Sequence, residues 1–259
     1  MNEPSGPAAN QPLLLRPDWP APARVRAACT TRLGGVSQGV YASLNMGRSG
    51  GDESAAVSEN RRRVHQALGL PAEPYWIKQV HGVRVVQMPP ATPESAPDPE
   101  ADASFTFEPG VVCAVQAADC LPVLFCDEAG TRVAAAHAGW RGLAGGVLER
   151  TVAALGVPPG QLLAWLGPAI GPEAFEVGEE VRDAFVAAEP GAAQAFRPGA
   201  VAGKHHADLF ALARRRLALA GVSRVCGGGL STHGDPARFY SYRRDGLTGR
   251  MAALIWLQP

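Results

Sequence analysis

The stretch from Val111 to Leu143 constrains the fold more than any other part of the sequence. It contains three short apolar runs, Val111–Ala118, Leu121–Cys126 and Val133–Ala136, which are separated by Asp119-Cys120 and by an Asp-Glu-Ala-Gly turn. Apolar runs of this length, bounded by turn residues, predict buried β-strands. We therefore expect three neighbouring strands in the interior of the protein.

Three reactive side chains interrupt or end these apolar runs: Asp119, Cys120 and His137. A polar group placed in an apolar interior without a partner costs about 2–7 kcal/mol. Something must compensate that cost, and the sequence therefore predicts a metal site or a Cys/His chemical site at this point.

The rest of the chain mixes strand and helix patterns, which favours one α/β domain over residues 23–259. Residues 1–22 are rich in Pro, Ala and Asn and are predicted to form a disordered tail. Further strands are expected at 23–31, 75–88, 162–170, 223–230 and 251–257, helices at 52–68, 144–155, 179–188 and 209–220, and loops at 89–103 and 189–207.

Charge and cysteine content exclude several classes of protein. The 24 basic and 24 acidic residues balance, so nothing favours a nucleic acid or an anionic membrane surface as partner. No apolar run approaches the length of a membrane helix. The five cysteines are odd in number and lie mostly within apolar runs, which indicates reduced thiols and a cytoplasmic protein.

Two loops carry candidate ligand-binding residues. Arg32 and Asn45 lie in a glycine-rich segment that could direct polar groups at a ligand, although its glycines could equally serve only to make turns. Arg141 precedes the predicted helix 144–155, so its planar donors and the helix N-terminus suit an anion. The alternative is that Trp140 packs and Arg141 pairs with a surface acid.

His81, Cys120 and His137 are 39 and 17 residues apart, and this spacing matches no local zinc motif. Their chemistry is nevertheless suggestive, because two imidazoles, a thiolate and a water make an open tetrahedral zinc site. The same residues also allow a metal-free pair, with Cys120 as nucleophile and His137 as base.

Seven motifs occur in an order typical of one family. They are TTRLGGVSQGVYASLN, KQVHG, ADCLPVLF, HAGWRG, GPAIGP, EVGEEV and FYSYRRDGLTGRM, spread over residues 24–255. In these motifs the chain resembles the polyphenol oxidase or laccase-domain family, also known as YfiH-type purine nucleoside phosphorylases. The resemblance implies zinc on His81, Cys120 and His137. It also implies a single domain of mixed β-sheets flanked by helices, in α/β/β/α-like layers similar to bacterial deamidase toxins.

The resemblance further implies an enzyme that acts on purine nucleosides. Such an enzyme cleaves adenosine, inosine and 5′-methylthioadenosine with phosphate, giving the base and a ribose 1-phosphate or its methylthio analogue, and it deaminates adenosine. On this interpretation Arg141 and Arg32 bind phosphate, and Asn45 and Gln79 bond to the sugar or base. Asp119 orients a zinc ligand or carries a proton. Both a monomer and a homodimer are compatible with the sequence.

Other functions remain open at this stage. One is an amidase-like hydrolase that edits a peptidoglycan precursor, using the same metal or the Cys120 nucleophile. Another is a metal-binding protein without catalysis, and a third is a copper-dependent phenol oxidase. Copper could occupy the same three ligands. However, a multicopper centre needs many histidines, and this chain has six without the His-Cys-His clusters of such centres.

Overall fold

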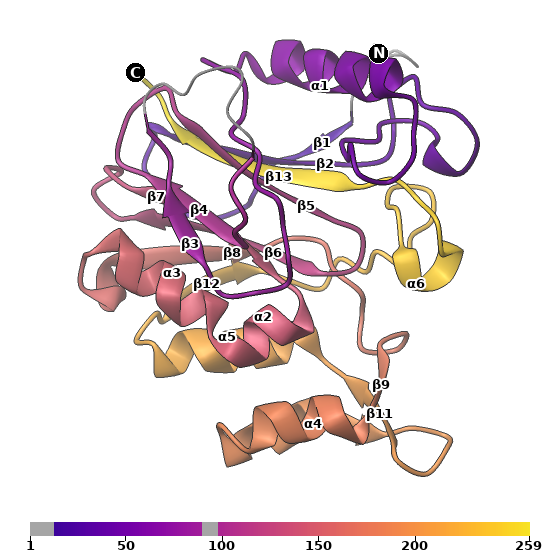
Figure 1. Ribbon diagram of the computed structural model, residues 1–259. Coiled ribbons are helices and arrows are strands. Elements are labelled where there is room, and N and C mark those ends of the chain that lie inside the picture. Colours follow the sequence, from indigo (N-terminus) through magenta and orange to yellow (C-terminus); the bar gives the residue numbers. More distant parts are fainter. Residues whose placement is uncertain (1–12, 90–97) are drawn as a thin grey trace, which may run out of the picture.

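The computed structural model describes residues 13–89 and 98–259 as two β-sheets packed face to face, with helices on their outer faces (Figure 1). The four-stranded sheet is antiparallel throughout. Its order is β1 (Leu14–Leu15), β2 (Val25–Thr30), β13 (Met251–Leu257) and β5 (Val112–Ala117). The last strand of the chain is thus inserted between two early ones.

The six-stranded sheet is mixed and carries the central stretch of the sequence. Its order is β12 (Arg224–Gly227), β8 (Leu162–Leu166), β6 (Leu121–Asp127), β7 (Val133–Ala138), β4 (Ala103–Thr106) and β3 (Val85–Gln87). The pairings make β7, β8 and β12 point one way and β3, β4 and β6 the other. Three strands therefore end, and three begin, at one end of this sheet, which we call the site end.

Six α-helices complete the described fold. They are α1 (Ser54–Leu68), α2 (Trp140–Gly145), α3 (Val147–Leu155), α4 (Glu179–Val186), α5 (Leu209–Leu219) and α6 (Tyr242–Asp245), with short 3-10 helices at Gly39–Tyr41, Pro159–Gln161 and Pro190–Ala195. Helix α1 covers the four-stranded sheet, whereas α2, α3 and α5 lie under the six-stranded sheet (Figure 1). These layers confirm the predicted α/β/β/α single-domain fold.

The apolar runs are continuous because both faces of the central strands are covered. Leu124 and Trp165 of the six-stranded sheet pack with Cys113 and Ile255 of the four-stranded sheet in a core between the sheets. A second core joins the opposite face of the six-stranded sheet to α3 and α5. The site end is consequently built on a rigid double layer.

Several predicted boundaries are wrong. Residues 13–22 do not belong to a tail, since Leu14 and Leu15 pair with β2, while residues 1–12 lie outside the described part. The predicted loop 189–207 contains β10 (Phe196–Pro198) and β11 (Lys204–Ala207), which join β9 (Glu176–Gly178) in a small third sheet. Gly146, with a φ of 96°, divides the predicted helix 144–155 into α2 and α3.

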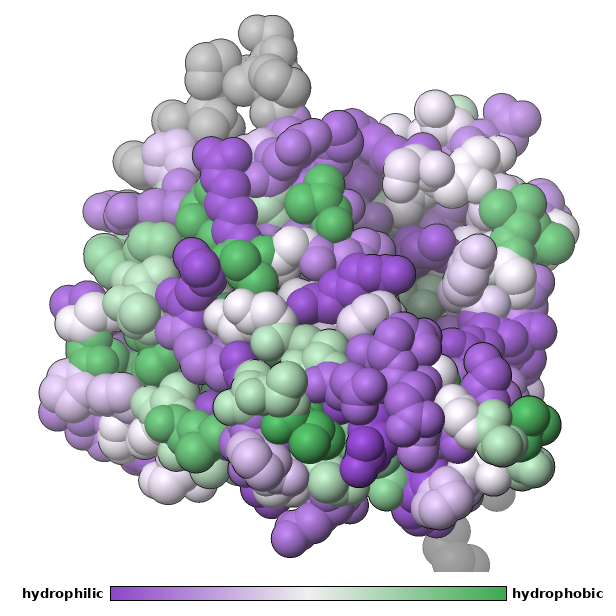
Figure 2. Space-filling view, turned by 60° about the horizontal axis from the view of Figure 1, so that its bottom comes forward, coloured by the Kyte–Doolittle hydropathy of each residue, from purple (hydrophilic) through white to green (hydrophobic). Residues whose placement is uncertain are grey.

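None of the described helices has the length and apolar composition needed to cross a membrane. On the face shown in Figure 2, hydrophobic residues are scattered between hydrophilic ones. This pattern is typical of an ordinary protein surface, where single apolar residues are common.

Leu124→Ala is expected to lower the free energy of unfolding by about 2–5 kcal/mol, because Leu124 is fully buried between the sheets. Chemical denaturation measures this loss. Leu219→Ala is the matched control, since Leu219 is 67% exposed at the end of α5 and its loss should cost little. Equal effects of the two substitutions would contradict the inter-sheet core.

Candidate metal centre and active site

The structure brings His81, Cys120 and His137 together at the site end. His81 lies in the loop before β3, Cys120 directly precedes β6, and His137 is near the end of β7. One ligand atom from each side chain lies within 4.8 Å of the others, and the Cys120 Sγ is 3.8 Å from His81 Nε2. Residues far apart in the sequence thus form one compact group because their strands share this end of the sheet.

A buried carboxylate, Asp102, holds two of these residues in place. Its Oδ1 accepts the His81 backbone N–H at 2.9 Å and lies 2.9 Å from the His137 Nδ1, while Oδ2 accepts the Gly82 N–H at 2.6 Å. Burial raises the pKa of Asp102, but hydrogen bonds from His137 and Gly82 outweigh it and lower the pKa overall. An ionised carboxylate can only accept, so His137 carries its proton on Nδ1 and turns Nε2 toward the site.

Asp102 was missed in the sequence because it falls in the predicted surface loop 89–103, of which residues 90–97 lie outside the described part. It is fully buried, directly before β4. Its position in the sequence could have identified Asp102, because it directly precedes an apolar strand. Asp119 likewise lies shortly before the apolar strand β6.

The group suits a tetrahedral ion with nitrogen and sulfur ligands. Zinc bonds of about 2.0–2.3 Å place ligand atoms roughly 3.5 Å apart; the Cys120 Sγ and His81 Nε2 are 3.8 Å apart, and all three ligand atoms lie within 4.8 Å of one another. Within residues 13–89 and 98–259, no fourth His, Cys, Asp or Glu joins the group. A tetrahedral ion would therefore take its fourth ligand from solvent or substrate, as catalytic rather than structural sites do.

The charges of Cys120 and His137 are coupled. Burial raises the pKa of the Cys120 thiol, but His137 and His81 outweigh burial and lower it overall. Burial lowers the pKa of His137, whereas the Cys120 charge and the hydrogen bond to Asp102 raise it overall. These directions favour a thiolate at Cys120, which is the form that binds metals and acts as a nucleophile.

Gly139 leaves room for the side chains of His81, Cys120 and His137, which we call the metal group. A Cβ at this position would lie 2.9 Å from His81 Cδ2 and 3.1 Å from Cys120 Sγ. Its φ of −62° suits any residue, so a side chain here would disturb the ligands without straining the backbone.

Gly139→Ala is therefore expected to weaken zinc binding roughly 10–100-fold, the range seen when the surroundings of metal ligands are disturbed. Competition with a chromogenic chelator measures the affinity. Gly160→Ala is the control, because a Cβ there meets nothing within 4 Å. Wild-type affinity in Gly139→Ala would refute the proposed crowding.

Asp119 contacts neither histidine of the group through any hydrogen bond in the described chain. Its carboxylate accepts the Thr232 hydroxyl and the Arg243 backbone N–H, each at 2.6 Å, and its carbonyl accepts the Ile170 N–H at 2.9 Å. The φ of Asp119 is 98°, a conformation that costs about 1–3 kcal/mol and persists only when neighbours fix it. Asp119 thus anchors the backbone that presents Cys120.

Three predicted substrate-binding residues use their polar groups within the fold. Arg32 donates to the carbonyls of Ala42 and Pro236, and the buried Asn45 amide bonds to Gly47, Asp52 and Arg250. The Gln79 amide exchanges two hydrogen bonds with the backbone of Gln116. Substrate contacts by these residues stay predictions.

Arg141 differs from those residues. It is exposed at the start of α2, beside Gly139, and its guanidinium lies 4.4 Å from the centre of the Trp140 ring. No hydrogen bond or ion pair occupies the Arg141 side chain in the part of the chain that the structure describes. Its donors are therefore not used by other groups of the described chain, two residues after Gly139.

Comparison with known proteins identifies the family. A family model described as "Multi-copper polyphenol oxidoreductase laccase" matches residues 26–258. A Pseudomonas aeruginosa protein named purine nucleoside phosphorylase is 60% identical over 244 residues, covering 94% of this chain and 98% of the relative. The purine nucleoside phosphorylase YfiH of Escherichia coli is 53% identical with the same coverage.

Solved structures of related proteins have the same fold. The fold matches the crystal structure of Neisseria meningitidis protein NMB0706 with a TM-score of 0.90 at 55% identity, covering 95% of this chain and 99% of that one. It matches YlmD from Geobacillus stearothermophilus with a TM-score of 0.88 at 34% identity, covering 95% and 96%. The chain therefore belongs to the family of multi-copper polyphenol oxidoreductase laccases that includes the YfiH-type proteins, which confirms the resemblance seen in its motifs.

Proposed function

We propose that this protein is a zinc-dependent purine nucleoside phosphorylase that uses adenosine, inosine and 5′-methylthioadenosine and also deaminates adenosine. The observation that carries the proposal is the convergence of His81, Cys120 and His137 within 4.8 Å in a chain whose full-length relatives are named purine nucleoside phosphorylases. The substrates would be a small nucleoside together with phosphate, or water in the deamination.

The two imidazoles and the thiolate would hold the ion, and they favour zinc or copper over magnesium or calcium. When bound, zinc supplies a Lewis acid and lowers the pKa of a water ligand toward about 7. A multicopper oxidase receives less support, because the described residues form one such group of three ligands.

The side chains around the group have definite tasks in this proposal. Asp102 keeps the proton of His137 on Nδ1 and fixes the ring. Arg141 offers a planar guanidinium to the phosphate. The sequence suggested Arg141 and the adjacent helix N-terminus together; because α2 has only six residues, the proposal assigns the phosphate to Arg141.

In phosphorolysis a phosphate oxygen forms a bond to the ribose C1′ while the bond from C1′ to the purine nitrogen breaks. The electron pair leaves with the purine, which takes up a proton. Adenosine and phosphate thus yield adenine and ribose 1-phosphate, whereas adenosine and water yield inosine and ammonia.

Chromatography of the products from adenosine, with and without phosphate, tests the proposal. We expect adenine and ribose 1-phosphate only when phosphate is present, and a slower formation of inosine in either case. Folded, zinc-loaded protein that forms none of these products would overturn the proposal.

One observation favours a second candidate, a hydrolase acting on an amide of a peptidoglycan precursor. Asp102, His137 and Cys120 form a chain in which the carboxylate orients the imidazole and the imidazole lies against the thiol. The same arrangement activates cysteine nucleophiles. An alkylating reagent that traps Cys120 and stops a metal-free, active enzyme would support this candidate, whereas full dependence on metal would exclude its nucleophilic form.

A further inference from the structure

Cys120 lies on the short segment that crosses from one sheet to the other. Strand β5 of the four-stranded sheet ends at Ala117, and β6 of the six-stranded sheet begins at Leu121. The cysteine side chain has a single torsion angle before its sulfur atom, so the place of the Sγ follows closely from the shape of this crossing. Asp102 bonds to both histidines of the metal group, but no hydrogen bond joins it to Cys120 in the described chain. Cys120 therefore depends on a support of its own.

Asp119 gives the crossing segment its shape. Its φ of 98° turns the chain sharply, and this conformation persists only where neighbours hold it. Its carbonyl accepts the Ile170 N–H, and its carboxylate accepts the Thr232 hydroxyl and the Arg243 N–H. The two donors to the carboxylate come 113 and 124 positions later in the sequence. The turn before Cys120 thus depends on the C-terminal part of the chain.

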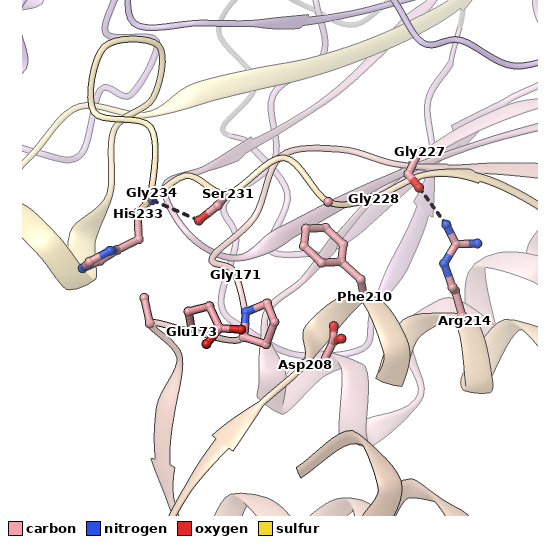
Figure 3. Close-up of a pocket in the computed structure, with 13 residues that line it drawn as sticks. Gly171, Glu173, Asp208, Phe210, Arg214, Gly227, Gly228, Ser231, His233 and Gly234 are labelled. Atoms are coloured by element: carbon pink, nitrogen blue, oxygen red, sulfur yellow. Dashed lines mark hydrogen bonds between the residues drawn. The ribbon is translucent and has the colours of Figure 1, made fainter. Parts of the chain in front are cut away.

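The Thr232 side chain points away from the cavity that its neighbours line. Ser231, His233 and Gly234 border a cavity of about 780 Å³, and the Ser231 Oγ accepts the Gly234 N–H at 3.0 Å (Figure 3). Thr232 is fully buried instead, and its Oγ1 lies 2.6 Å from the Asp119 Oδ1. The hydroxyl is the donor in this bond, because a carboxylate oxygen accepts. Thr232 therefore serves the crossing segment and not a ligand in the cavity.

Backbone hydrogen bonds fix Thr232 on both sides. Its N–H donates to the Ala169 carbonyl at 2.8 Å, and its carbonyl accepts from the Arg244 Nη1 at 2.8 Å. The Arg244 guanidinium also donates to two neighbouring carbonyls, at 3.0 and 2.9 Å. Arg244 belongs to α6, which also contains Arg243. Both donors to the Asp119 carboxylate are consequently parts of one connected unit.

We propose that Thr232 is a positioning residue for the metal group, whose hydroxyl fixes the turn at Asp119 and thereby the direction of the Cys120 thiolate. This inference rests on the zinc site of the proposed function and deepens it by assigning a second support. The histidines and the cysteine are then held by separate carboxylates, Asp102 and Asp119.

Thr232→Val tests the inference, because valine has nearly the shape of threonine and lacks the hydroxyl. We expect the Kd for zinc, measured by competition with a chromogenic chelator, to rise roughly 10-fold, the lower end of the range for residues around metal ligands. In the cobalt-substituted protein, the charge-transfer band from the Cys120 sulfur to cobalt should shift or weaken, because the direction of the sulfur changes. Thr232→Ser keeps the hydroxyl and should restore the wild-type affinity and spectrum.

Thr151→Val is the matched control. Thr151 is also fully buried, and its hydroxyl donates to the Val147 carbonyl at 2.7 Å within α3, outside the metal group. This variant should lose some stability but keep the zinc affinity and the cobalt spectrum of the wild type. A destabilised Thr232→Val protein with wild-type affinity and spectrum would overturn the inference and show that Thr232 only holds its loop.

Asp119→Gly decides the question if Thr232→Val does not fold. Glycine adopts a φ of 98° without strain, so the turn remains possible, but both hydrogen bonds to the carboxylate are lost. We expect zinc affinity to fall at least roughly 10-fold, and unchanged affinity would overturn the inference. A wild-type chain that binds zinc but forms no product from adenosine would overturn the proposed activity and leave this inference standing. A wild-type chain that binds no zinc would overturn both.

Discussion

Cys120→Ala is expected to abolish both metal binding and nucleoside turnover. The substitution removes the thiolate and leaves only the two imidazoles of His81 and His137, which cannot make a three-ligand site. Metal analysis of the purified variant should show less than one tenth of an ion per chain under conditions that saturate the wild type. Turnover of adenosine should fall by at least about 100-fold.

The control for this variant is Cys226→Ala, which removes a thiol from β12 outside the metal group. It should keep its metal and its activity, because the group of possible metal ligands found in the described residues does not include Cys226. A metal-free Cys120→Ala protein with full activity would contradict the role given to the metal. Loss of activity with the metal retained would instead favour Cys120 as a nucleophile.

Asp102→Asn is expected to have the second largest effect. An amide has the size of the carboxylate but cannot accept from His81, Gly82 and His137 at once without turning its own donors toward one of them. Zinc affinity should fall roughly 10–100-fold, and weakening a buried hydrogen bond to a charged group should cost about 1.5–3 kcal/mol of unfolding free energy.

Two measurements show whether Asp102 positions the metal ligands or only stabilises the fold. Chelator competition gives the zinc affinity, and the visible spectrum of the cobalt-substituted protein reports the ligand geometry. Asp183→Asn, at an exposed position of α4, is the control and should change neither readout. A destabilised Asp102→Asn protein that binds cobalt with the wild-type spectrum and affinity would show that Asp102 supports the fold only.

Much of the fold could be predicted because its central strands are covered on both faces. β13 follows the predicted run 251–257 residue for residue, and β6 extends its predicted run by one residue. The small sheet could not be predicted, since β9 and β10 have three residues each and β11 consists of Lys, His, His and Ala. Such short polar strands carry no clear alternation.

The candidate site was only partly predictable, because its residues come from separate segments of the sequence. The spacing of the three metal ligands carries no signal, so their assignment depended on the motifs around them. Asp102 was hidden among the other acids of its segment, from which its burial and its position directly before an apolar strand distinguish it. Arg32, Asn45 and Gln79 show that polar residues in glycine-rich or strand-edge segments often hold the backbone of those segments.

His233 does not join the metal group in the described chain. Its placement leaves the metal group with three protein ligands in the described chain.

The most direct test of a zinc-dependent nucleoside enzyme is the rate of adenosine phosphorolysis measured across a series of zinc-to-protein ratios, with bound metal assayed in each sample. We predict a rate that rises in proportion to bound zinc and levels off at one ion per chain. Full turnover by protein stripped of divalent metal would contradict the account.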